Sequence, residues 1–331
     1  MASPAPVLAL VGATGLVGSA LLESFTSTLQ TSRLSTLRIL TSRPSAPALA
    51  AVQNVPGVEI KEVHYGVGGA SLDAALEGAD VLVSAMGASE TGEGKYEENK
   101  KKLVEAAVRA GVKVYVPSEW GTDHNGRNGD VVSSPMFKDK QKHHAWAQEQ
   151  GLRVLAVYCG LILEISFSDW LGIPISSPSP TWTIPTPPTR VAFTSLTSLG
   201  PFTLSAILQT LSSSFFSPSN LSSPIPTRLR IYSDCLSIDE AADLWEKAAG
   251  GKVERVYRTE EELRERWETV KPTLKEGMLG PAIPLMMSMG GFDHTKDSAN
   301  ELLNVGDFAF KPKTVADFLQ EKARELKKED A

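Results

Sequence analysis

A glycine-rich turn between an apolar strand and a helix constrains this chain more than any other feature. Residues 7–19 read VLALVGATGLVGS, so five apolar residues run directly into a turn that contains Gly12, Gly15 and Gly18. The following stretch carries apolar residues at four-residue spacing on one side: Val17, Leu21, Phe25 and Leu29. A buried strand, a glycine turn and an amphipathic helix in this order indicate the first βαβ unit of a parallel sheet.

Each glycine of this turn has a separate role if the turn binds a dinucleotide. A side chain at Gly12 obstructs the turn, one at Gly15 keeps the backbone away from a pyrophosphate, and one at Gly18 pushes the helix off the sheet. The helix N-terminus then presents free N–H groups to phosphate. The alternative is a glycine turn that only joins a strand to a helix. We expect a dinucleotide to contact Gly12, Thr14, Gly15, Leu16, Val17 and Gly18.

Length and charge exclude several classes of protein. The 331 residues are enough for one large or two moderate domains, and 33 basic against 39 acidic residues give a net charge of −6. No basic block is long enough to follow a nucleic-acid backbone. We also expect no secretory leader and no membrane span, because no apolar segment approaches about eighteen residues. Two separated cysteines fit a reduced, cytoplasmic setting.

Strand and helix patterns alternate through the first half of the chain. This alternation predicts an α/β fold with a doubly wound, parallel, Rossmann-like sheet. We expect an NAD(P)-binding domain at residues 1–160 and a smaller substrate lobe at 161–331, some segments of which return to the main sheet. Its Pro/Ser/Thr-rich stretch 173–188 predicts an irregular region with short edge strands. The tail 315–328, amphipathic and then charged, predicts a solvated terminal helix.

The ends of the predicted strands suggest which cofactor binds. After the strand 37–41 there is no acid to hold a ribose 2′-hydroxyl, but Arg43 is placed to hold the 2′-phosphate of an NADP-type cofactor. A solvated arginine is the alternative. Ligands of open parallel sheets bind at the carboxyl ends of the strands. Two further pairs lie at such ends and complete the expected cofactor site: Met86 with Gly87, and Cys159 with Gly160.

Residues that could handle a proton follow the strand 113–116. Ser118 and Glu119 come directly after it, and Lys140 lies in the next helix. Short-chain dehydrogenases pair such a serine with Tyr-x-x-x-Lys in that helix, where this chain has no tyrosine. The same spacing does occur at Tyr96 and Lys100, but one βα unit earlier, so we treat that pair as a minor alternative. Trp120, Leu161, Ile162, Ile165 and Trp170, together with Glu119, are candidate substrate contacts.

Two other patterns argue against rival chemistries. His143 and His144 are adjacent, so on a helix they diverge by about 100° and do not easily share a metal ion. Asp123 and His124 lie near Ser118, but the chain has no G-x-S-x-G elbow for a hydrolase. We therefore expect neither a metal site nor a hydrolytic triad.

Taken together, these motifs resemble the NmrA-like, isoflavone reductase-like family of atypical short-chain dehydrogenases. The resemblance rests on GATGLVG at 12–18, Arg43, VPSEWG at 116–121, FKDK at 137–140 and SIDEAADLWE at 237–246. Two positions depart from the family pattern: Ser198 begins the segment that is Asp-Ile-Gly in the family, and Lys100 replaces the usual glutamine. The resemblance implies NADPH as cofactor, an aromatic secondary metabolite as substrate, and Lys140 as general acid or base.

The family resemblance and the residues lead to one preferred function and two alternatives. We predict an NADPH-dependent oxidoreductase with Lys140 and Ser118 as catalytic residues. A lysine beside a nicotinamide loses solvation and faces a positive ring, both of which favour its neutral amine. The alternatives are a non-catalytic NADP(H)-sensing regulator and a redox-neutral isomerase or cyclase. The sequence leaves a homodimer open.

Overall fold

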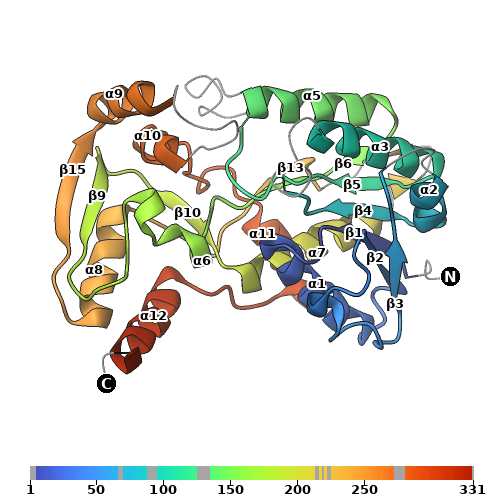
Figure 1. Ribbon diagram of the computed structural model, residues 1–331, viewed down its shortest axis with the longest axis horizontal. Helices are drawn as coiled ribbons and strands as arrows, with labels where there is room; N and C mark the ends of the chain where they lie inside the picture. Colours follow the sequence, from blue (N-terminus) through green and yellow to red (C-terminus); the bar gives the residue numbers. More distant parts are fainter. Residues whose placement is uncertain are drawn as a thin grey trace.

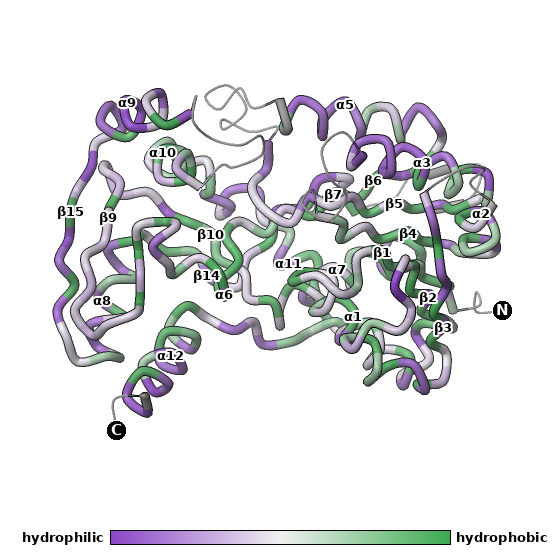
Figure 2. The backbone as a smooth tube through the Cα atoms, in the orientation of Figure 1, coloured by the Kyte–Doolittle hydropathy of each residue, from purple (hydrophilic) through white to green (hydrophobic). Residues whose placement is uncertain are grey.

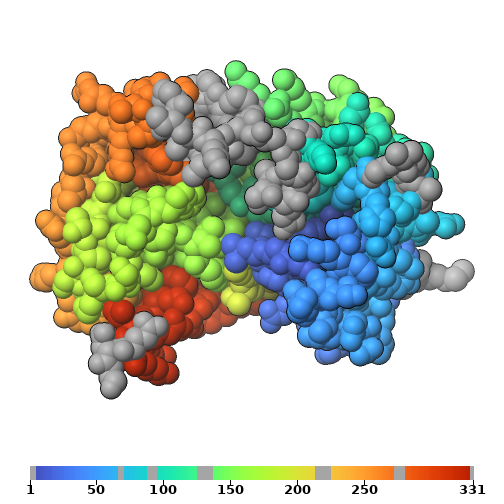
Figure 3. Space-filling view, viewed as in Figure 1, coloured from blue at the N-terminus to red at the C-terminus, as the bar shows by residue number. Residues whose placement is uncertain are grey.

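The computed structural model describes residues 5–65, 70–87, 95–124, 135–212, 216–217, 220–221, 225–271 and 280–329. The N-terminal half and the lobe lie toward opposite ends of the long axis of the molecule (Figures 1 and 3). Within the described ranges, no helix is both long and apolar enough to cross a membrane.

A parallel sheet of six strands forms the centre of the N-terminal half (Figure 1). Its strand order is β3-β2-β1-β4-β5-β6, and every adjacent pair is parallel. This order reverses direction beside β1, which is the doubly wound arrangement predicted from the alternating pattern. The strands are β1 (Val7–Val11), β2 (Thr36–Thr41), β3 (Val58–Glu62), β4 (Val81–Ser84), β5 (Val114–Val116) and β6 (Arg153–Val154).

Helices cover both faces of this sheet because successive strand residues point to opposite sides. From β1, Leu8 and Leu10 pack toward α1 and α7, whereas Ala9 and Val11 pack toward the helices of the other face. Figure 2 shows the apolar strands enclosed between helices that are polar on their outer sides. The first face is covered by α1 (Leu16–Leu29) and α7 (Leu196–Ser212), and the second by α2 (Ala70–Leu76), α3 (Lys95–Arg109) and α5 (Pro135–Glu149).

The sixth strand changes partner part-way along. Leu155 still donates from its backbone to Tyr115 of β5, but Ala156 donates to Thr227. The chain therefore leaves β5 and continues as β7 (Ala156–Tyr158), which pairs in parallel with β13 (Arg228–Arg230). The sequence 153–158 by itself reads as one strand, but the strand is divided at this point because its second partner begins only at Arg228.

The lobe has its own core, built from segments that are distant in sequence. Phe167, Trp182, Phe193 and Trp245 are buried there together. The strands are β8 (Leu161–Ile162), β9 (Thr181–Thr186), β10 (Val191–Thr194), β14 (Asp234–Leu236) and β15 (Glu254–Thr259). The helices are α6 (Leu163–Ser166), α8 (Ile238–Ala249), α9 (Glu260–Val270), α10 (Ile283–Ser288), α11 (Asn300–Leu303) and α12 (Val315–Glu329).

One sequence expectation about the lobe is confirmed and one is wrong. The stretch 173–188 contains a short edge strand, β9, which pairs with β15 in a sheet of two strands. The terminal helix α12 is not simply solvated, since Val315, Phe318 and Leu319 are buried in the lobe core beside α8. The partner of α12 is remote in sequence, so local composition did not reveal this burial.

Helix α7 of the second half, like β13, packs on the first half of the chain. Helix α7 packs on α1 so closely that a Cβ at Gly200 would lie 2.4 Å from the Cβ of Ser24. This contact fixes α1, and with it the glycine turn that begins the helix.

Candidate functional site

The glycine turn after β1 is held against the loop after β4. Gly12 has a φ of +79°, and a Cβ there would lie 2.6 Å from the carbonyl oxygen of Ala85. A Cβ at Gly18 would lie 1.9 Å from the carbonyl oxygen of Gly12. Neither position admits a side chain, so the backbone of the turn is fixed in the form expected of a pyrophosphate-binding loop.

The N-terminus of α1 carries no side-chain cap. Its N-cap residue is Gly15, whose backbone is extended, and the first helical residue, Leu16, is 46% exposed. First-turn N–H groups have no acceptor within a helix. The turn therefore offers donors and a positive helix end to a diphosphate, and its residues fit the dinucleotide predicted from the sequence.

Arg43 lies at the carboxyl end of β2, on the edge where the glycine turn opens. Its side chain is exposed, and its backbone N–H donates to Thr41 Oγ1 at 3.0 Å. No ion pair of its guanidinium is found within the described residues. The position is therefore open to a phosphate group, which suits the predicted contact with the NADP 2′-phosphate.

Two hydroxyl groups converge on the carbonyl oxygen of Met86, just after β4. Ser118 Oγ donates to it at 2.9 Å and the Tyr96 hydroxyl at 3.4 Å. Burial, with smaller contributions from Glu119 and Glu97, raises the pKa of Tyr96, so this side chain stays a neutral phenol. The sequence separates Tyr96 from Ser118 by a whole βα unit, yet parallel neighbours β4 and β5 end at the same edge and bring the two together.

Lys100 is buried beneath Tyr96. Its ammonium lies 2.7 Å from a carboxylate oxygen of Glu97 and 4.7 Å from the centroid of the Tyr96 ring. The Tyr-x-x-x-Lys pair that the sequence analysis treated as a minor alternative is therefore adjacent to Ser118. Its role stays untested.

Lys140 is held at the carboxyl end of β5. Its Nζ donates to the carbonyl oxygen of Ser118 at 3.0 Å and to Glu119 Oε2 at 3.2 Å. Helix α5 brings the lysine to this point and keeps 17% of its side chain exposed. The carboxylate is a counter-charge to the ammonium, and the two form a largely buried ion pair.

Glu119 is buried and accepts hydrogen bonds from several side chains, whereas the sequence predicted that it would line the substrate site. Its side chain is 2% exposed, and it also accepts hydrogen bonds from His124 Nε2 at 2.9 Å and His144 Nε2 at 2.8 Å. Burial alone would raise the pKa of Glu119, but the Lys140 ammonium and these two imidazoles hold it well below its usual range. The substrate contact predicted for Glu119 does not fit this position, since both carboxylate oxygens are already engaged.

His143 and His144 have different partners, as expected for adjacent residues on a helix. His143 points away from His144 and shares a hydrogen bond of 3.2 Å with the Tyr115 hydroxyl. Burial, with Lys100 and His144 adding to its effect, lowers the pKa of His143 to about 3, so this imidazole is neutral.

His144 joins a cluster that the sequence analysis missed. The ligand atoms of His144, His124 and Glu119 lie within 4.8 Å of one another. Such a set could hold a metal ion, but Lys140 already neutralises the carboxylate, and hydrogen bonds account for the cluster without one. The expectation of no metal stays a prediction. The signal in the sequence was the spacing of four between Lys140 and His144, which places both on one face of a helix.

The profile of the NmrA-like family matches residues 5–279. The chain belongs to the NmrA-like family. This confirms the resemblance drawn from the glycine turn, Arg43 and the motif at 116–121.

Individual relatives are distant. A protein from Aspergillus flavus named oxidoreductase aprR is 29% identical over 105 residues, which are 31% of this chain and 33% of that protein. The match thus spans about a third of that relative's length. The leucoanthocyanidin reductase of Vitis vinifera, solved with NADPH, is 18% identical with a TM-score of 0.71, covering 96% of this chain and 99% of that one.

A further structure, from a study of pinoresinol-lariciresinol and phenylcoumaran benzylic ether reductases, is 17% identical with a TM-score of 0.76. It covers 96% of this chain and 99% of that one. At such identities these structures show that this NmrA-like chain shares their fold.

The remaining predicted site residues divide into buried and exposed groups. Cys159 is fully buried, and burial raises the pKa of its thiol to about 12, so it is not a nucleophile. Leu161 and Ile162 are also buried. Ile165 and Trp170 are 44% and 50% exposed, which leaves them free to contact a substrate. Trp120 is half-buried, and its indole N–H donates to the carbonyl oxygen of Ser84 at 3.1 Å.

Two positions that resemble catalytic or family motifs have structural roles in this NmrA-like chain. Asp123 does not pair with His124, because its carboxylate accepts from Arg228 at 2.6 Å and from Arg230 at 2.9 Å. Ser198, at the family's aspartate position, is buried and accepts from the backbone N–H of Lys313 at 3.1 Å.

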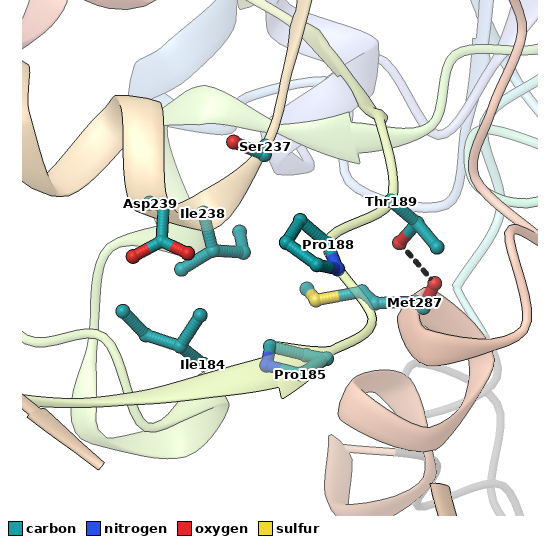
Figure 4. A pocket seen from close by; sticks show the side chains of 8 residues that line it. All are labelled: Ile184, Pro185, Pro188, Thr189, Ser237, Ile238, Asp239 and Met287. Atoms are coloured by element: carbon teal, nitrogen blue, oxygen red, sulfur yellow. Dashed lines mark hydrogen bonds between the residues drawn. The ribbon is translucent and has the colours of Figure 1, made fainter. Parts of the chain in front are cut away.

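A small recess in the lobe is separate from this site (Figure 4). It lies between the end of β9 and the start of α8, and a hydrogen bond from Thr189 to the Met287 carbonyl oxygen closes one side. Two prolines, 185 and 188, form much of its wall, and none of the predicted site residues lines it.

Proposed function

We propose that this protein is an NADPH-dependent reductase of a small aromatic or conjugated metabolite, in which Lys140 acts as the general acid. The observation that carries the proposal is the placement of the Lys140 ammonium between the Ser118 carbonyl and the Glu119 carboxylate. It lies at the edge of the sheet where the glycine turn opens. A proton donor and a diphosphate-binding turn on one edge are what a hydride-transfer reaction requires.

The cofactor part of the proposal rests on residues of the N-terminal half. The uncapped N-terminus of α1 would hold the diphosphate, and Arg43 would hold the 2′-phosphate. The Vitis vinifera structure with NADPH supports the same assignment by its shared fold. When bound, NADPH supplies a hydride to the substrate.

The remaining chemistry belongs to the chain's own residues. Lys140 gives a proton to the substrate oxygen, which gains negative charge as the carbon accepts the hydride. Ser118 orders the Met86 turn beside it. The exposed Ile165 and Trp170 offer apolar surface to a planar ring.

The proposal is tested with a panel that contains 1,4-benzoquinone, benzalacetone and a benzylic ether. Oxidation of NADPH is followed by absorbance, and binding of NADPH by calorimetry. We expect Lys140→Ala to bind NADPH normally but to lose about 100-fold or more in kcat, the usual range for a general acid. Lys142→Ala is the matched control, because this lysine on the same helix has a side chain that is 79% exposed.

Each contrary result has a clear meaning. Full turnover by Lys140→Ala would refute the role of this lysine. Tight NADPH binding without oxidation across the panel would favour the sensing regulator or the redox-neutral enzyme. Failure to bind NADPH would refute the proposal as a whole.

A further inference from the structure

The two oxygens of the Glu119 carboxylate face different partners on one helix. Oε2 accepts from Lys140 Nζ at 3.2 Å, and Oε1 accepts from His144 Nε2 at 2.8 Å. Lys140 and His144 are four residues apart on α5, so they lie one above the other on the same face. The carboxylate thus forms a bridge between the ammonium and an imidazole.

Burial distinguishes the two imidazoles that contact this carboxylate. The His124 side chain is fully buried, and its Nδ1 has no hydrogen-bond partner among the described residues. His144 is 12% exposed, so it reaches the surface of the molecule, whereas Glu119 does not. Lys140 is itself 17% exposed, so a proton would need to enter through His144 once a bound substrate covers the lysine. His124 offers no such entry, because its side chain does not reach solvent.

We propose that His144 and Glu119 form a proton relay that returns a proton to Lys140 after each reduction. The proposal rests on the proposed function and deepens it. His144 and Glu119 act through Lys140 and do not touch the substrate, so they are positioning residues that also conduct the proton.

The relay balances one proton per turnover. The hydride brings two electrons and forms a C–H bond on the substrate, whose oxygen takes a proton from Lys140 and leaves a neutral amine. Glu119 accepts the Nε2 proton of His144 at Oε1 while His144 takes up a solvent proton at Nδ1, and the carboxyl then turns about its Cγ–Cδ bond and passes the proton to Nζ. His144 returns to its Nε2–H form by proton exchange with water, so NADPH, one solvent proton and the substrate give NADP⁺ and the reduced product.

The electrostatics of the cluster make the transfer run toward Lys140. In the resting protein the ammonium is the main charge that lowers the pKa of Glu119, against the effect of burial. Once Lys140 has given up its proton, its charge no longer lowers the pKa of Glu119, whereas burial still raises it. The carboxylate therefore becomes a better proton acceptor.

Four further titratable groups interact with Glu119: His124 of the same loop, Tyr96 from α3, Tyr115 from β5 and His143 from α5. Burial is the main cause that lowers the pKa of His143 to about 3, so this imidazole is neutral. Burial raises the pKa of both tyrosines, so both remain neutral phenols. His124 donates to Oε2 and has no onward partner in the described part of the chain.

The first test needs no enzyme activity. Protein labelled with ¹³C-glutamate reports the titration of the Glu119 carboxyl by NMR, and Lys140→Met copies the uncharged lysine. We expect the Glu119 pKa to rise in Lys140→Met, since burial remains and the ammonium is gone. A Glu119 titration that does not differ between wild type and Lys140→Met would overturn the relay.

The second test separates a relay from a structural contact. His144→Gln can still donate a hydrogen bond to Glu119 but cannot carry a proton. We expect its first turnover after rapid mixing with NADPH and the best panel substrate to match wild type, because Lys140 starts protonated. Steady-state turnover should fall about tenfold or more. Added imidazole should restore His144→Ala, and Lys142→Ala should show neither effect.

The outcomes distinguish this inference from the proposed function. Wild-type steady-state turnover in His144→Gln, or a first turnover slowed as much as the steady state, would show a structural role for His144. No rescue of His144→Ala by imidazole would also count against the relay. Absence of NADPH oxidation by the wild type would refute the proposed function itself, whatever the NMR titration shows.

Discussion

Arg43 separates the two nicotinamide cofactors at the scale of a single residue. Its exposed guanidinium makes no ion pair within the described ranges, and no acid directly follows β2 in the sequence to hold a ribose 2′-hydroxyl, so its contribution should be specific to the 2′-phosphate. We expect Arg43→Ala to weaken NADPH binding about tenfold, which is the size of one charge-assisted hydrogen bond. NADH binding should change little. Calorimetry with both cofactors measures the difference, and an equal loss for both would contradict the assignment.

The sequence predicted the residues of the glycine turn. It also predicted Lys140 and Ser118, but not the contacts that His124 and His144 make with Glu119. Gly18 is required by a steric contact with Gly12 inside the turn itself, which a sequence motif can record. Gly12 is required by the approach of Ala85 from the loop after β4, and there the motif marks the glycine without naming its neighbour.

Glu119 illustrates the limit. Its motif marked it as functional, but its burial depends on His124 of the same loop and on Lys140 and His144, which α5 brings to it. The spacing within one segment does not determine how that segment meets a helix that packs on it.

At the scale of elements, α8 shows how much stability one local motif contributes. Ser237 and Glu240 form a capping box: Glu240 N–H donates to Ser237 Oγ at 3.2 Å, and Ser237 N–H donates to Glu240 Oε2 at 2.7 Å. Behind it, Trp245 is fully buried in the lobe core. We expect Ser237→Ala to lower the free energy of unfolding by about 1 kcal/mol, since one helix N–H loses its acceptor.

Urea denaturation measures this change, and Ser27→Ala is the control. Ser27 is exposed in the interior of α1 and donates only to Ser24 of the preceding turn, so alanine should be tolerated there without loss. Equal destabilisation of the two variants would show that the cap contributes nothing special.

Elements whose signals are local were predicted well, and those that depend on remote partners were not. The helix at 238–249 has a cap, an amphipathic face and a terminal glycine within fifteen residues, so the sequence itself marks both its start and its end. The division of the sixth strand follows instead from pairing with β13. A single segment carries no information about such a partner.

At the scale of the whole molecule, buried neutral histidines make stability depend on pH. The His294 side chain is buried, and its Nδ1 makes a hydrogen bond of 3.1 Å with the carbonyl oxygen of Ile231. Burial, with a contribution from Arg230, lowers the pKa of His294 to about 4. His143 is lowered further, to about 3, also chiefly by burial. An unfolded chain binds these protons near pH 6.5, so below that pH it takes up protons that the folded protein refuses.

The stability supplied by the neutral histidines is complete above about pH 6.5 and is lost as the pH falls toward 4, so the Tm should decrease over this range.

His294→Asn keeps an amide donor near the Ile231 carbonyl but cannot titrate. Its Tm should therefore change less between pH 7.5 and 4.5 than that of the wild type, even if its stability at pH 7.5 is lower. His64→Asn, at a side chain that is 64% exposed, should retain the wild-type dependence. Calorimetric scans at the two pH values decide the point, and parallel curves for wild type and His294→Asn would show that this buried imidazole does not set the acid sensitivity of the fold.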